Sequence, residues 1–591
     1  MKILSVHYGH NATVALLIDG KIVFCQSEER LNKLKNSTGF PDLTLNLLKE
    51  KFGSDFDLVV IPNKTILSYA YLKNTGENSF RPEGDFASTR KIDFNFLLRY
   101  LFFKYFPKIA YKIWSKKVLS YAEKLEEDKN LREEYINYLS KKIGIEKSKI
   151  LFLDHHDAHA YAAAFGIDQN KETLIFTADG EGDNWSSTVR LYKNGQFEIL
   201  SRSGRLNSLG ALYTEITGLL GMRQGEDEYK VMGLAPYAKN GSKQVERVYN
   251  KISKLISLNS KLEFESVIPA VGICRYYLFE YLVYERFDNV AAGLQKFLED
   301  IVSQWVEGWV QKTGVKDIAL SGGIFMNVKL NQKLAELKEV KSVFPMPSAG
   351  DESLPIGGLL YGYKVYCDQN HNEFNPILLS DLYFGQEFGD NEIKSCIEKS
   401  KYRNKFKIKI PKDIEGAIAD LLAKNKIVAR YNGRMEWGAR ALGNRSILAN
   451  PFSRDNVRII NEMIKNRDFW MPFAASILEE DFDRYMINPK KIKSSYMTMT
   501  FNSTEAARKD LIAGLHSYDF TCRPQIVRKA TNSSYYGIIS KFKKKTGIGG
   551  VLNTSFNLHG EPLAFSPEDA LHVFLDSGLE NLAIGRYLLS K

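Results

Sequence analysis

The alternation of apolar and polar positions divides the first part of the chain into repeated strand–turn–strand units. Residues 3–26 predict three strands, joined by a small polar turn and by Asp19-Gly20, and residues 173–200 repeat this plan with Asn194-Gly195 as the second turn. Such dipeptides between alternating apolar runs are strong hairpin signals. A third segment, DIALSGGIFMNVKLNQKL, predicts a buried strand, a Gly322-Gly323 turn and a helix. The pattern predicts an α/β fold with a duplicated unit.

The periodicity fades after Cys367, where polar residues accumulate in the run CDQNHNEFNP. A loss of periodicity of this kind favours a boundary, so we predict one domain at 1–366 and a second at 367–591. The second domain begins with a helix-like run, EGAIADLLAKN, and a strand, KIVARYN. A chain of 591 residues also exceeds one ordinary core, which supports two large domains.

The composition is that of a globular protein, with 44% hydrophobic and 26% charged residues. Met1 leads directly into a strand pattern, which argues against an export signal, and the chain has no apolar run of membrane-spanning length. The five cysteines form no CxxC pair, which fits a reducing compartment and argues against zinc ribbons and disulfides. We therefore expect a cytoplasmic protein.

The net charge of +11 indicates an anionic partner, and much of it lies in residues 90–117, within a helical insertion predicted at about 90–145. Lysines and arginines interleave there with Phe, Tyr, Leu and Trp. In one interpretation the aromatic side chains pack on the body of the protein while the basic side chains extend to solvent. In the other the segment is a docking face for a membrane or an anionic acceptor.

The run LDHHDAHAYAAAF is compatible with a helix, on which His155 and His159 lie four residues apart and share one face. His156 points elsewhere. A histidine pair alone more often lines a packed helix than binds a metal. Here Asp179 and Asp351 lie on turn-like segments that could complete a site, and two imidazoles with two carboxylates suit Fe, Mn or Zn.

A second candidate site is basic. Arginine forks and glycine amides are what a phosphorylated substrate requires, and the surrounding Gly, Ala, Trp and Leu favour a lined pocket over a solvated face. The polar residues of this candidate site are Arg434, Arg440, Arg445, Lys465, Arg467, Arg523, Asn553 and Ser555. Backbone approach to a nucleotide is further predicted at Gly180, Gly322 and Gly323.

The repeated hairpins resemble the way in which the actin and sugar-kinase superfamily opens each of its halves. The motifs GHNATVALL, DHHDAHAYAAAF, YKVMGLAPYA, GDESLPIGG, GRMEWGARALGNRS, IKNRDFW and NTSFNLHGEP resemble, in this order, the O-carbamoyltransferases of antibiotic tailoring and nodulation-factor synthesis, including the tobramycin and cephamycin types. This resemblance implies an N-terminal actin-like (ASKHA) domain of duplicated ribonuclease-H-like units, similar to the tRNA threonylcarbamoyladenosine transferase. It also implies a C-terminal YrdC-like domain of the α+β type.

The resemblance further implies a reaction in two steps. Carbamoyl phosphate and ATP, with Mg²⁺, give a carbamoyl-adenylate, whose carbamoyl group then passes to a hydroxyl of an antibiotic, sugar or glycan acceptor. Iron, or Mn²⁺ or Zn²⁺ in its place, would be held by His155, His159, Asp179 and Asp351. The catalytic set would be His10, Arg440, Lys465, Arg523 and Ser555. A homodimer is a further expectation.

Two positions depart from the family pattern, because Ala439 stands where the family usually has Pro and Met471 where it usually has Arg. The second change removes an anion contact, for which another basic residue would have to substitute. Two other functions stay open: a tRNA threonylcarbamoyl-type modification enzyme, and an actin-like nucleotide-binding protein without carbamoyl chemistry. The C-terminal motifs favour carbamoyl transfer over either, and they disfavour a nucleic-acid partner.

Overall fold

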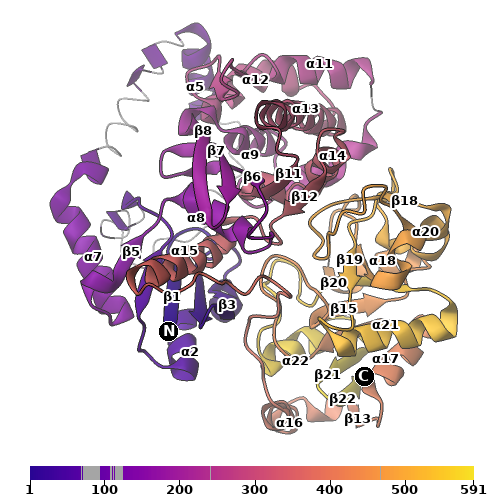
Figure 1. Cartoon of the computed structure of the whole chain (residues 1–591). Coiled ribbons are helices and arrows are strands. Elements are labelled where there is room, and N and C mark those ends of the chain that lie inside the picture. Colours follow the sequence, from indigo (N-terminus) through magenta and orange to yellow (C-terminus); the bar gives the residue numbers. More distant parts are fainter. Residues whose placement is uncertain are drawn as a thin grey trace. The chain divides into compact units, whose positions relative to one another are not determined.

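The computed structural model describes residues 1–67, 69–70, 73, 94–106, 109–110, 112–113, 124–239, 241–465 and 467–591. The chain divides into two compact units (Figure 1). The first unit comprises residues 1–23 and 36–378, and the second comprises residues 24–35 and 379–591. The predicted boundary after residue 366 therefore needs correction. Helix α15 (Leu354–Gln369) runs through it, and the following strand-like segment returns to the first unit, where Ile377 N donates to Gly20 O at 3.0 Å.

The first unit contains two five-stranded sheets of the same design. Their strand orders are β3-β2-β1-β4-β5 and β8-β7-β6-β11-β12. In each sheet the first three strands along the chain are antiparallel neighbours, and the last two run parallel to the central strand, β1 or β6. The strands are β1 (Lys2–His7), β2 (Thr13–Ile18), β3 (Lys21–Ser27), β4 (Leu58–Ile61), β5 (Ile150–Phe152), β6 (Thr173–Gly182), β7 (Trp185–Lys193), β8 (Gln196–Gly204), β11 (Asp317–Ser321) and β12 (Ser342–Pro345). The predicted duplication is thus confirmed.

Both predicted hairpin turns are present. Asp19 and Gly20 have φ values of 47° and 78° between β2 and β3, and Asn194 and Gly195 have 49° and 73° between β7 and β8. Two successive positive φ values define the tight turn that matches the twist of a hairpin.

Two helices separate the sheets. Helix α15 packs on β1 and β4, and α8 (His155–Ala164) packs on β6 and β11, while the helices also contact each other (Figure 1). Their close approach depends on small residues, since a Cβ atom on Gly357 would overlap the backbone of Ala158. The glycines of the PIGG motif therefore serve helix packing, which brings the start of α15 to the start of α8.

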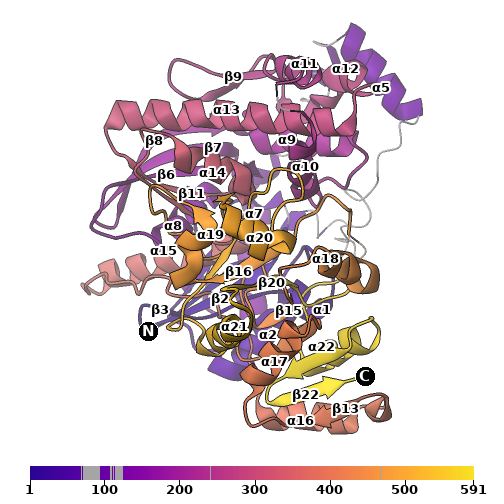
Figure 2. The same cartoon turned by 90° about the vertical axis from the view of Figure 1, so that its right-hand side faces the viewer.

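Further helices cover the outer side of the second sheet. The 27-residue helix α13 spans that side (Figure 2), and its Trp305 ring lies 4.9 Å from the ring of Phe176 on β6. The other elements of this unit are α2 (Asp42–Phe52), α5 (Phe94–Tyr105), α7 (Lys129–Ile143), α9 (Leu209–Leu219), α10 (Glu228–Leu234), α11 (Lys243–Ile252), β9 (Ile256–Leu258), β10 (Phe264–Ser266), α12 (Arg275–Leu282), α13 (Phe287–Thr313) and α14 (Val328–Glu336). Within the described ranges, every helix is too short or too polar to cross a bilayer.

The second unit is built on one mixed sheet of eight strands in the order β13-β22-β21-β14-β15-β20-β16-β19. The strands are β13 (Lys407–Lys409), β14 (Val428–Tyr431), β15 (Arg445–Ala449), β16 (Ala474–Leu478), β19 (Gln525–Val527), β20 (Gly550–Ser555), β21 (Asn581–Ile584) and β22 (Tyr587–Ser590). The helices include α16 (Asp390–Lys399), α17 (Ile414–Ala423), α18 (Asp455–Ile460), α21 (Ser533–Thr546) and α22 (Pro567–Leu575). The predicted α17 and β14 are present, and the protein is of the mixed α/β class.

Candidate functional site

Helix α8 positions two of the predicted metal ligands. Asp154 caps its N-terminus by accepting hydrogen bonds from the amides of His156 and Asp157. His155 and His159 then fall one turn apart on the same face, with ring centroids 4.8 Å from each other, and both are buried. The helix prediction is confirmed, and four-residue spacing does place the imidazoles together.

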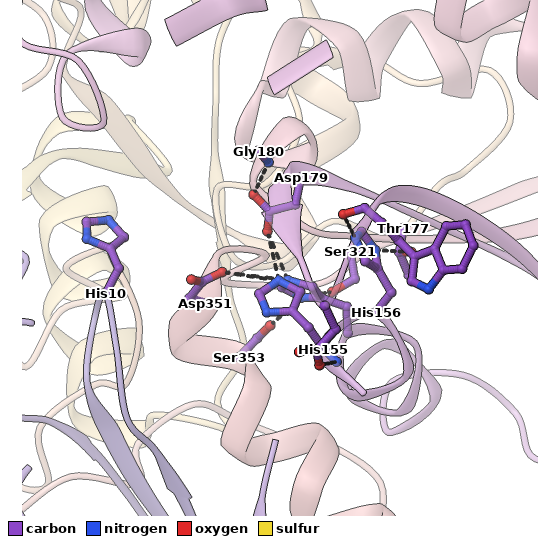
Figure 3. Close-up of polar contacts among 12 residues, drawn as sticks. His10, His155, His156, Thr177, Asp179, Gly180, Ser321, Asp351 and Ser353 are labelled. Atoms are coloured by element: carbon purple, nitrogen blue, oxygen red, sulfur yellow. Dashed lines mark hydrogen bonds and ion pairs between the residues drawn. The ribbon is translucent and has the colours of Figure 1, made fainter. Parts of the chain in front are cut away.

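The two predicted carboxylates, Asp179 and Asp351, lie next to the histidine rings (Figure 3). Asp179 lies near the end of β6, and Asp351 lies at the start of the turn that leads into α15. The Nε2 atom of His159 lies 3.0 Å from Asp179 Oδ2 and 3.8 Å from Asp351 Oδ1. The Nε2 atom of His155 lies 3.6 and 3.7 Å from the same two atoms. One ligand atom from each of the four residues lies within 4.8 Å of the other three.

The electrostatics of this quartet favour a shared cation. Burial lowers the pKa of His155, but the carboxylates of Asp179 and Asp351 outweigh burial and raise that pKa to about 9. Burial raises the pKa of Asp179, and the neighbouring imidazoles of His155 and His159 outweigh it and hold that pKa well below its ordinary value. Within the part of the chain that the structure describes, His155 Nε2 is buried and has no hydrogen-bond partner. Two buried imidazoles facing two carboxylates fit a divalent metal of the Fe, Mn or Zn type, which would take the place of the imidazole proton.

Neighbouring groups fix the orientation of the quartet. His159 Nδ1 lies 3.3 Å from the hydroxyl oxygens of Ser321 and Ser353, and the amide of Gly180 donates to Asp179 Oδ1 at 2.6 Å. The backbone amide of His155 donates to Asp183 at 2.8 Å. Such contacts hold a ligand's ring or carboxylate in one orientation and raise metal affinity.

The predicted glycines make room for these side chains. A Cβ atom on Gly323 would lie 2.9 Å from Asp179 Oδ1, and one on Gly322, whose φ is +99°, would overlap the backbone of Ala178. A Cβ atom on Gly180 would enter open space, while one on Gly182 would overlap the His155 ring. Gly322 and Gly323 therefore let the β11 turn approach Asp179, and Gly180 faces the open side.

His156 points away from the quartet, as predicted. Its Nε2 donates to Trp185 O at 3.1 Å, and its Nδ1 accepts from the Thr177 hydroxyl at 2.8 Å. Arg190 donates to the Thr188 hydroxyl, so Thr188 donates its own proton to Thr177 and Thr177 donates to His156. Because Nδ1 accepts this hydrogen bond, it carries no proton, and the His156 ring is neutral. His156 holds α8 against β6 and β7 and contributes no ligand.

His10 and His7 lie at the end of β1. The His10 side chain is exposed, and Figure 3 shows it apart from the quartet, with no contact drawn between them. The residue that the sequence interpretation missed is His7, which is buried, lies 3.9 Å from Asp351 Oδ2 and donates through Nε2 to the His10 carbonyl at 2.8 Å. Burial lowers the pKa of His7 to about 4, so its ring is neutral near pH 7. The ring lies between the backbone carbonyl of His10 and the carboxylate of Asp351. A histidine ending a buried strand was the available signal.

In the second unit, the loop between β14 and β15 is organised by a buried carboxylate. Glu436 Oε1 accepts hydrogen bonds from the amides of Leu442, Asn444 and Arg445 at 2.7 to 3.1 Å. The Arg445 guanidinium is fully buried, donates to the carbonyls of Asn432, Gly433 and Asn444, and lies 3.7 Å from the Tyr431 ring centroid.

Arg434 likewise donates to the carbonyls of Phe384 and Gly385. Both arginines, predicted as anion ligands, thus hold the loop in its conformation. The reason is that loop carbonyls in a Gly-rich segment lack regular partners and take up the guanidinium donors.

The Glu436 contacts predict a stability effect. We expect Glu436→Ala to lower the free energy of unfolding by about 3 kcal/mol or more, because three buried amides lose a charged acceptor. Glu436→Gln keeps an acceptor oxygen and should cost less. Urea unfolding of the full chain measures the difference. Glu505→Ala, at a side chain that is 88% exposed, is the control and should stay within about 0.5 kcal/mol of the parent. Equal stability of the Glu436→Ala variant and the parent would contradict this role.

Four other basic residues of the second unit converge on the end of β20. Lys465, at the end of a π-helical turn (Asn461–Lys465), is buried and donates to Ser555 Oγ at 3.0 Å and to Asn557 O at 2.9 Å. Arg467 donates to the same Ser555 hydroxyl at 3.3 Å. Burial lowers the pKa of Lys465 well below its usual value, and the charge of Arg467 lowers it further. Burial and the charges of Arg440 and Arg467 also lower the pKa of Arg523.

This basic cluster (Arg440, Lys465, Arg467 and Arg523) therefore brings three partly exposed guanidinium groups close to the buried charge of Lys465, an arrangement that a bound anion stabilises. Asn553 lies beneath it and donates to Ala441 O and Ser476 Oγ in the core. A cavity of about 350 Å³ adjoins Arg467 and is lined by Met471 together with Arg454 and Arg458. Other arginines thus stand near the position where Met471 replaces the family's usual arginine.

Comparison with known proteins matches both parts of the chain to one family. The family model for the carbamoyltransferase N-terminus matches residues 2–360, and the one for the carbamoyltransferase C-terminus matches residues 419–591. An uncharacterized protein of Methanocaldococcus jannaschii is 30% identical over all of this chain and 99% of its own length. Nodulation protein NolNO of Sinorhizobium fredii is 28% identical over 98% of this chain and 79% of its own length.

The 3'-hydroxymethylcephem-O-carbamoyltransferase of Amycolatopsis lactamdurans is 27% identical over 45% of this chain and 47% of its own length. The resemblance predicted from the motifs is confirmed over both parts of the chain, and the protein is a transferase. It belongs to the carbamoyltransferase family.

Proposed function

We propose that this carbamoyltransferase works in two steps, one in each unit. In the second unit, water cleaves carbamoyl phosphate to carbamate and inorganic phosphate. The carbamate oxygen then attacks the α-phosphate of ATP, so that carbamoyl-adenylate forms and pyrophosphate leaves. In the first unit, a hydroxyl of a small-molecule or glycan acceptor attacks the carbamoyl carbon, and AMP leaves. Adenylation is needed because carbamate is a poor electrophile without a good leaving group. ATP and carbamoyl phosphate are cytosolic metabolites, so we place the reaction in the cytoplasm.

The observation that carries the proposal is the basic cluster of the second unit. Lys465 is buried with neutral acceptors and cationic neighbours, a state that costs free energy unless an anion is bound. The Ser555 hydroxyl accepts from Lys465 and Arg467, which leaves its own proton to donate to a phosphate oxygen. Planar guanidinium groups such as that of Arg523 bind phosphate oxygens in pairs. These features support a site for a phosphorylated donor and for ATP with its Mg²⁺.

The quartet of the first unit supports the transfer step. His155, His159, Asp179 and Asp351 would hold a divalent metal, for which iron is our first choice. A metal bound there would supply Lewis acidity to the carbamoyl oxygen and to the adenylate phosphate. The residues around it would orient the ligands and exclude water on the α8 side. His10 is exposed on its turn, where it is accessible to a substrate, and would orient the acceptor hydroxyl or take its proton.

The proposal includes a fold assignment for each unit. The equal strand order of the two sheets in the first unit supports an actin-like (ASKHA) domain of duplicated ribonuclease-H-like halves. In such a domain the two turns after the first strands face each other across the ligand site. For the second unit we propose a YrdC-like domain, on the basis of the motifs GRMEWGARALGNRS and NTSFNLHGEP alone.

The test is the dependence of ATP cleavage on carbamoyl phosphate. We expect the purified full chain to release pyrophosphate from ATP only when carbamoyl phosphate is present, because the carbamate is the nucleophile. Chromatography of the nucleotides and a coupled pyrophosphate assay measure both products. Equal ATP turnover without carbamoyl phosphate would exclude the adenylate step and favour an actin-like ATPase. Dependence on threonine and bicarbonate instead would favour tRNA threonylcarbamoyl chemistry.

A further inference from the structure

Helix α5 and the residues after it expose a row of large apolar side chains. Its outward face is formed by Leu97, Leu98, Leu101, Phe102, Tyr105, Phe106, Ile109 and Ile113, each between 38% and 64% exposed. Most of these positions recur at four-residue spacing, and the amides of Phe106 and Ala110 continue the helical hydrogen bonds beyond Tyr105. They therefore share one side of a helical segment. Soluble monomers rarely expose so many apolar side chains together without a function for them.

The opposite side of the same helix is packed on the protein. Tyr100, Phe103 and Ala110 are buried in a cluster with Ile273 and Tyr276. The Phe103 ring stacks on that of Tyr276 with centroids 4.9 Å apart, and the Tyr100 ring meets Phe279 of α12 at 5.4 Å. Figure 2 shows α5 alongside α12 at one end of the first unit. Because this side is fixed to α12, the apolar row is held outward in a defined orientation.

The segment is strongly basic as well as apolar. Residues 90–117 contain eight basic residues, Arg90, Lys91, Arg99, Lys104, Lys108, Lys112, Lys116 and Lys117, against the single acidic residue Asp93. Among the described side chains, Lys104 pairs with Glu280 of α12, and Arg99 is exposed. The described helical residues contribute Arg99, Lys104 and Lys112 to this set. A sequence segment with four to eight basic residues at an amphipathic helix is typical of surfaces that bind anionic lipid headgroups.

We propose that α5, together with Phe106, Ile109 and Ile113, forms a membrane-docking face that binds the surface of a bilayer containing anionic lipids. The apolar row enters the boundary between headgroups and acyl chains, and the exposed Arg99 contacts phosphate groups. The aromatic rings of Phe102, Tyr105 and Phe106 suit this boundary, where apolar and polar surroundings meet. The helix lies on the bilayer and does not cross it. This role is independent of the carbamoyl chemistry.

Vesicle flotation with the purified full chain tests the proposal. We expect binding to vesicles of phosphatidylcholine mixed with phosphatidylglycerol, and much weaker binding to pure phosphatidylcholine. The double variant Leu101→Glu and Phe106→Glu removes two exposed apolar side chains that would enter the bilayer and adds charge repulsion, so affinity should fall by roughly 100-fold or more. Arg99→Gln should lower affinity by roughly fivefold. Binding by the parent should weaken as salt rises, because headgroup attraction is screened.

The matched control is Ile410→Glu with Ile487→Glu, two apolar-to-acidic changes at exposed positions of the second unit. It should bind vesicles like the parent, and both double variants should keep the parent's melting temperature and pyrophosphate release. Three results would overturn the proposal: no vesicle binding by the parent, equal binding by the Leu101→Glu and Phe106→Glu variant, or a homodimer that this variant dissociates without any vesicle binding. Binding to RNA in place of vesicles would assign the face to nucleic acid and would also overturn it.

Discussion

Replacing His155 with alanine is expected to abolish carbamoyl transfer while leaving pyrophosphate release from ATP largely intact. His155 offers a buried Nε2 to the quartet, and loss of one of four ligands should lower transfer by roughly 10³-fold through loss of the metal. Asp351→Ala should behave in the same way. In the proposed mechanism, pyrophosphate release depends on the basic cluster of the second unit, which shares no side chain with the quartet. Separate assays of pyrophosphate and of carbamoylated acceptor measure the two steps.

Metal content gives a second readout that does not depend on activity. After incubation with Fe²⁺ or Mn²⁺ and gel filtration, elemental analysis should find about one ion per chain in the parent and little in the His155→Ala variant. His156→Gln is the matched control from the same helix, because His156 bonds to Thr177 and Trp185 and contributes no ligand. It should retain the ion. A folded His155→Ala protein that loses pyrophosphate release as well would show that the two reactions are not divided between the units as proposed.

The local parts of both sites could be predicted from the sequence. The pairing of His155 and His159 needs only helical spacing, and the hairpin turns at Asp19-Gly20 and Asn194-Gly195 need only the dipeptides and their flanks. The approach of Asp179 and Asp351 to α8 could not be derived in this way, because it depends on how β6 and α15 pack on that helix. For those residues the resemblance to a family supplied the prediction.

The second site shows where residue type misleads. Arg434 and Arg445 have the same side chain as Arg440 and Arg523, yet their guanidinium groups are taken up by backbone carbonyls. The sequence shows that an arginine is present, but it does not show whether the guanidinium group donates to backbone carbonyls or is available to a ligand. Glu436 was overlooked for the same reason, since its function is to accept the loop amides.

The domain boundary was misplaced because a polar run marks the end of a helix as readily as the end of a domain. The run CDQNHNEFNP begins inside α15, whose buried residues include Cys367. The polar residues then follow the surface of the first unit, where the amide of Asn372 donates to Cys367 O at 2.9 Å. Loss of periodicity alone therefore gave the right region and the wrong residue.

Changing Lys465 to methionine is expected to stop pyrophosphate release while leaving the protein at least as stable as the parent. The lysine is buried beside Arg467 and bonds only to neutral acceptors among the described residues, so its charge opposes folding. Methionine has a similar volume and no charge. In the proposed mechanism the Lys465 charge binds the phosphorylated donor, so pyrophosphate release should fall by roughly 10²- to 10³-fold. Denaturant unfolding and the pyrophosphate assay measure the two effects.

The pH dependence of stability gives a further check on the same lysine. Its pKa is lowered in the folded chain, so between that value and the unfolded value near 10.4 the unfolded chain binds more protons. Stability of the parent should therefore rise with pH across this window, and the penalty should develop as pH falls toward the folded pKa. Lys465→Met should lack this rise. Pyrophosphate added near neutral pH should raise the melting temperature of the parent and not of the variant, because an anion offsets the buried charge.

Lys543 provides the matched contrast within the second unit. It pairs with the buried carboxylate of Asp481 at 2.6 and 2.8 Å, so Lys543→Met leaves that carboxylate without its cation. We expect this variant to lose about 1–3 kcal/mol of stability and to keep its pyrophosphate release. The two lysines should thus give opposite results, since one charge serves the fold and the other serves the ligand. If Lys465→Met were strongly destabilised and still released pyrophosphate, Lys465 would be a structural residue, and the donor site would have to lie elsewhere in the unit.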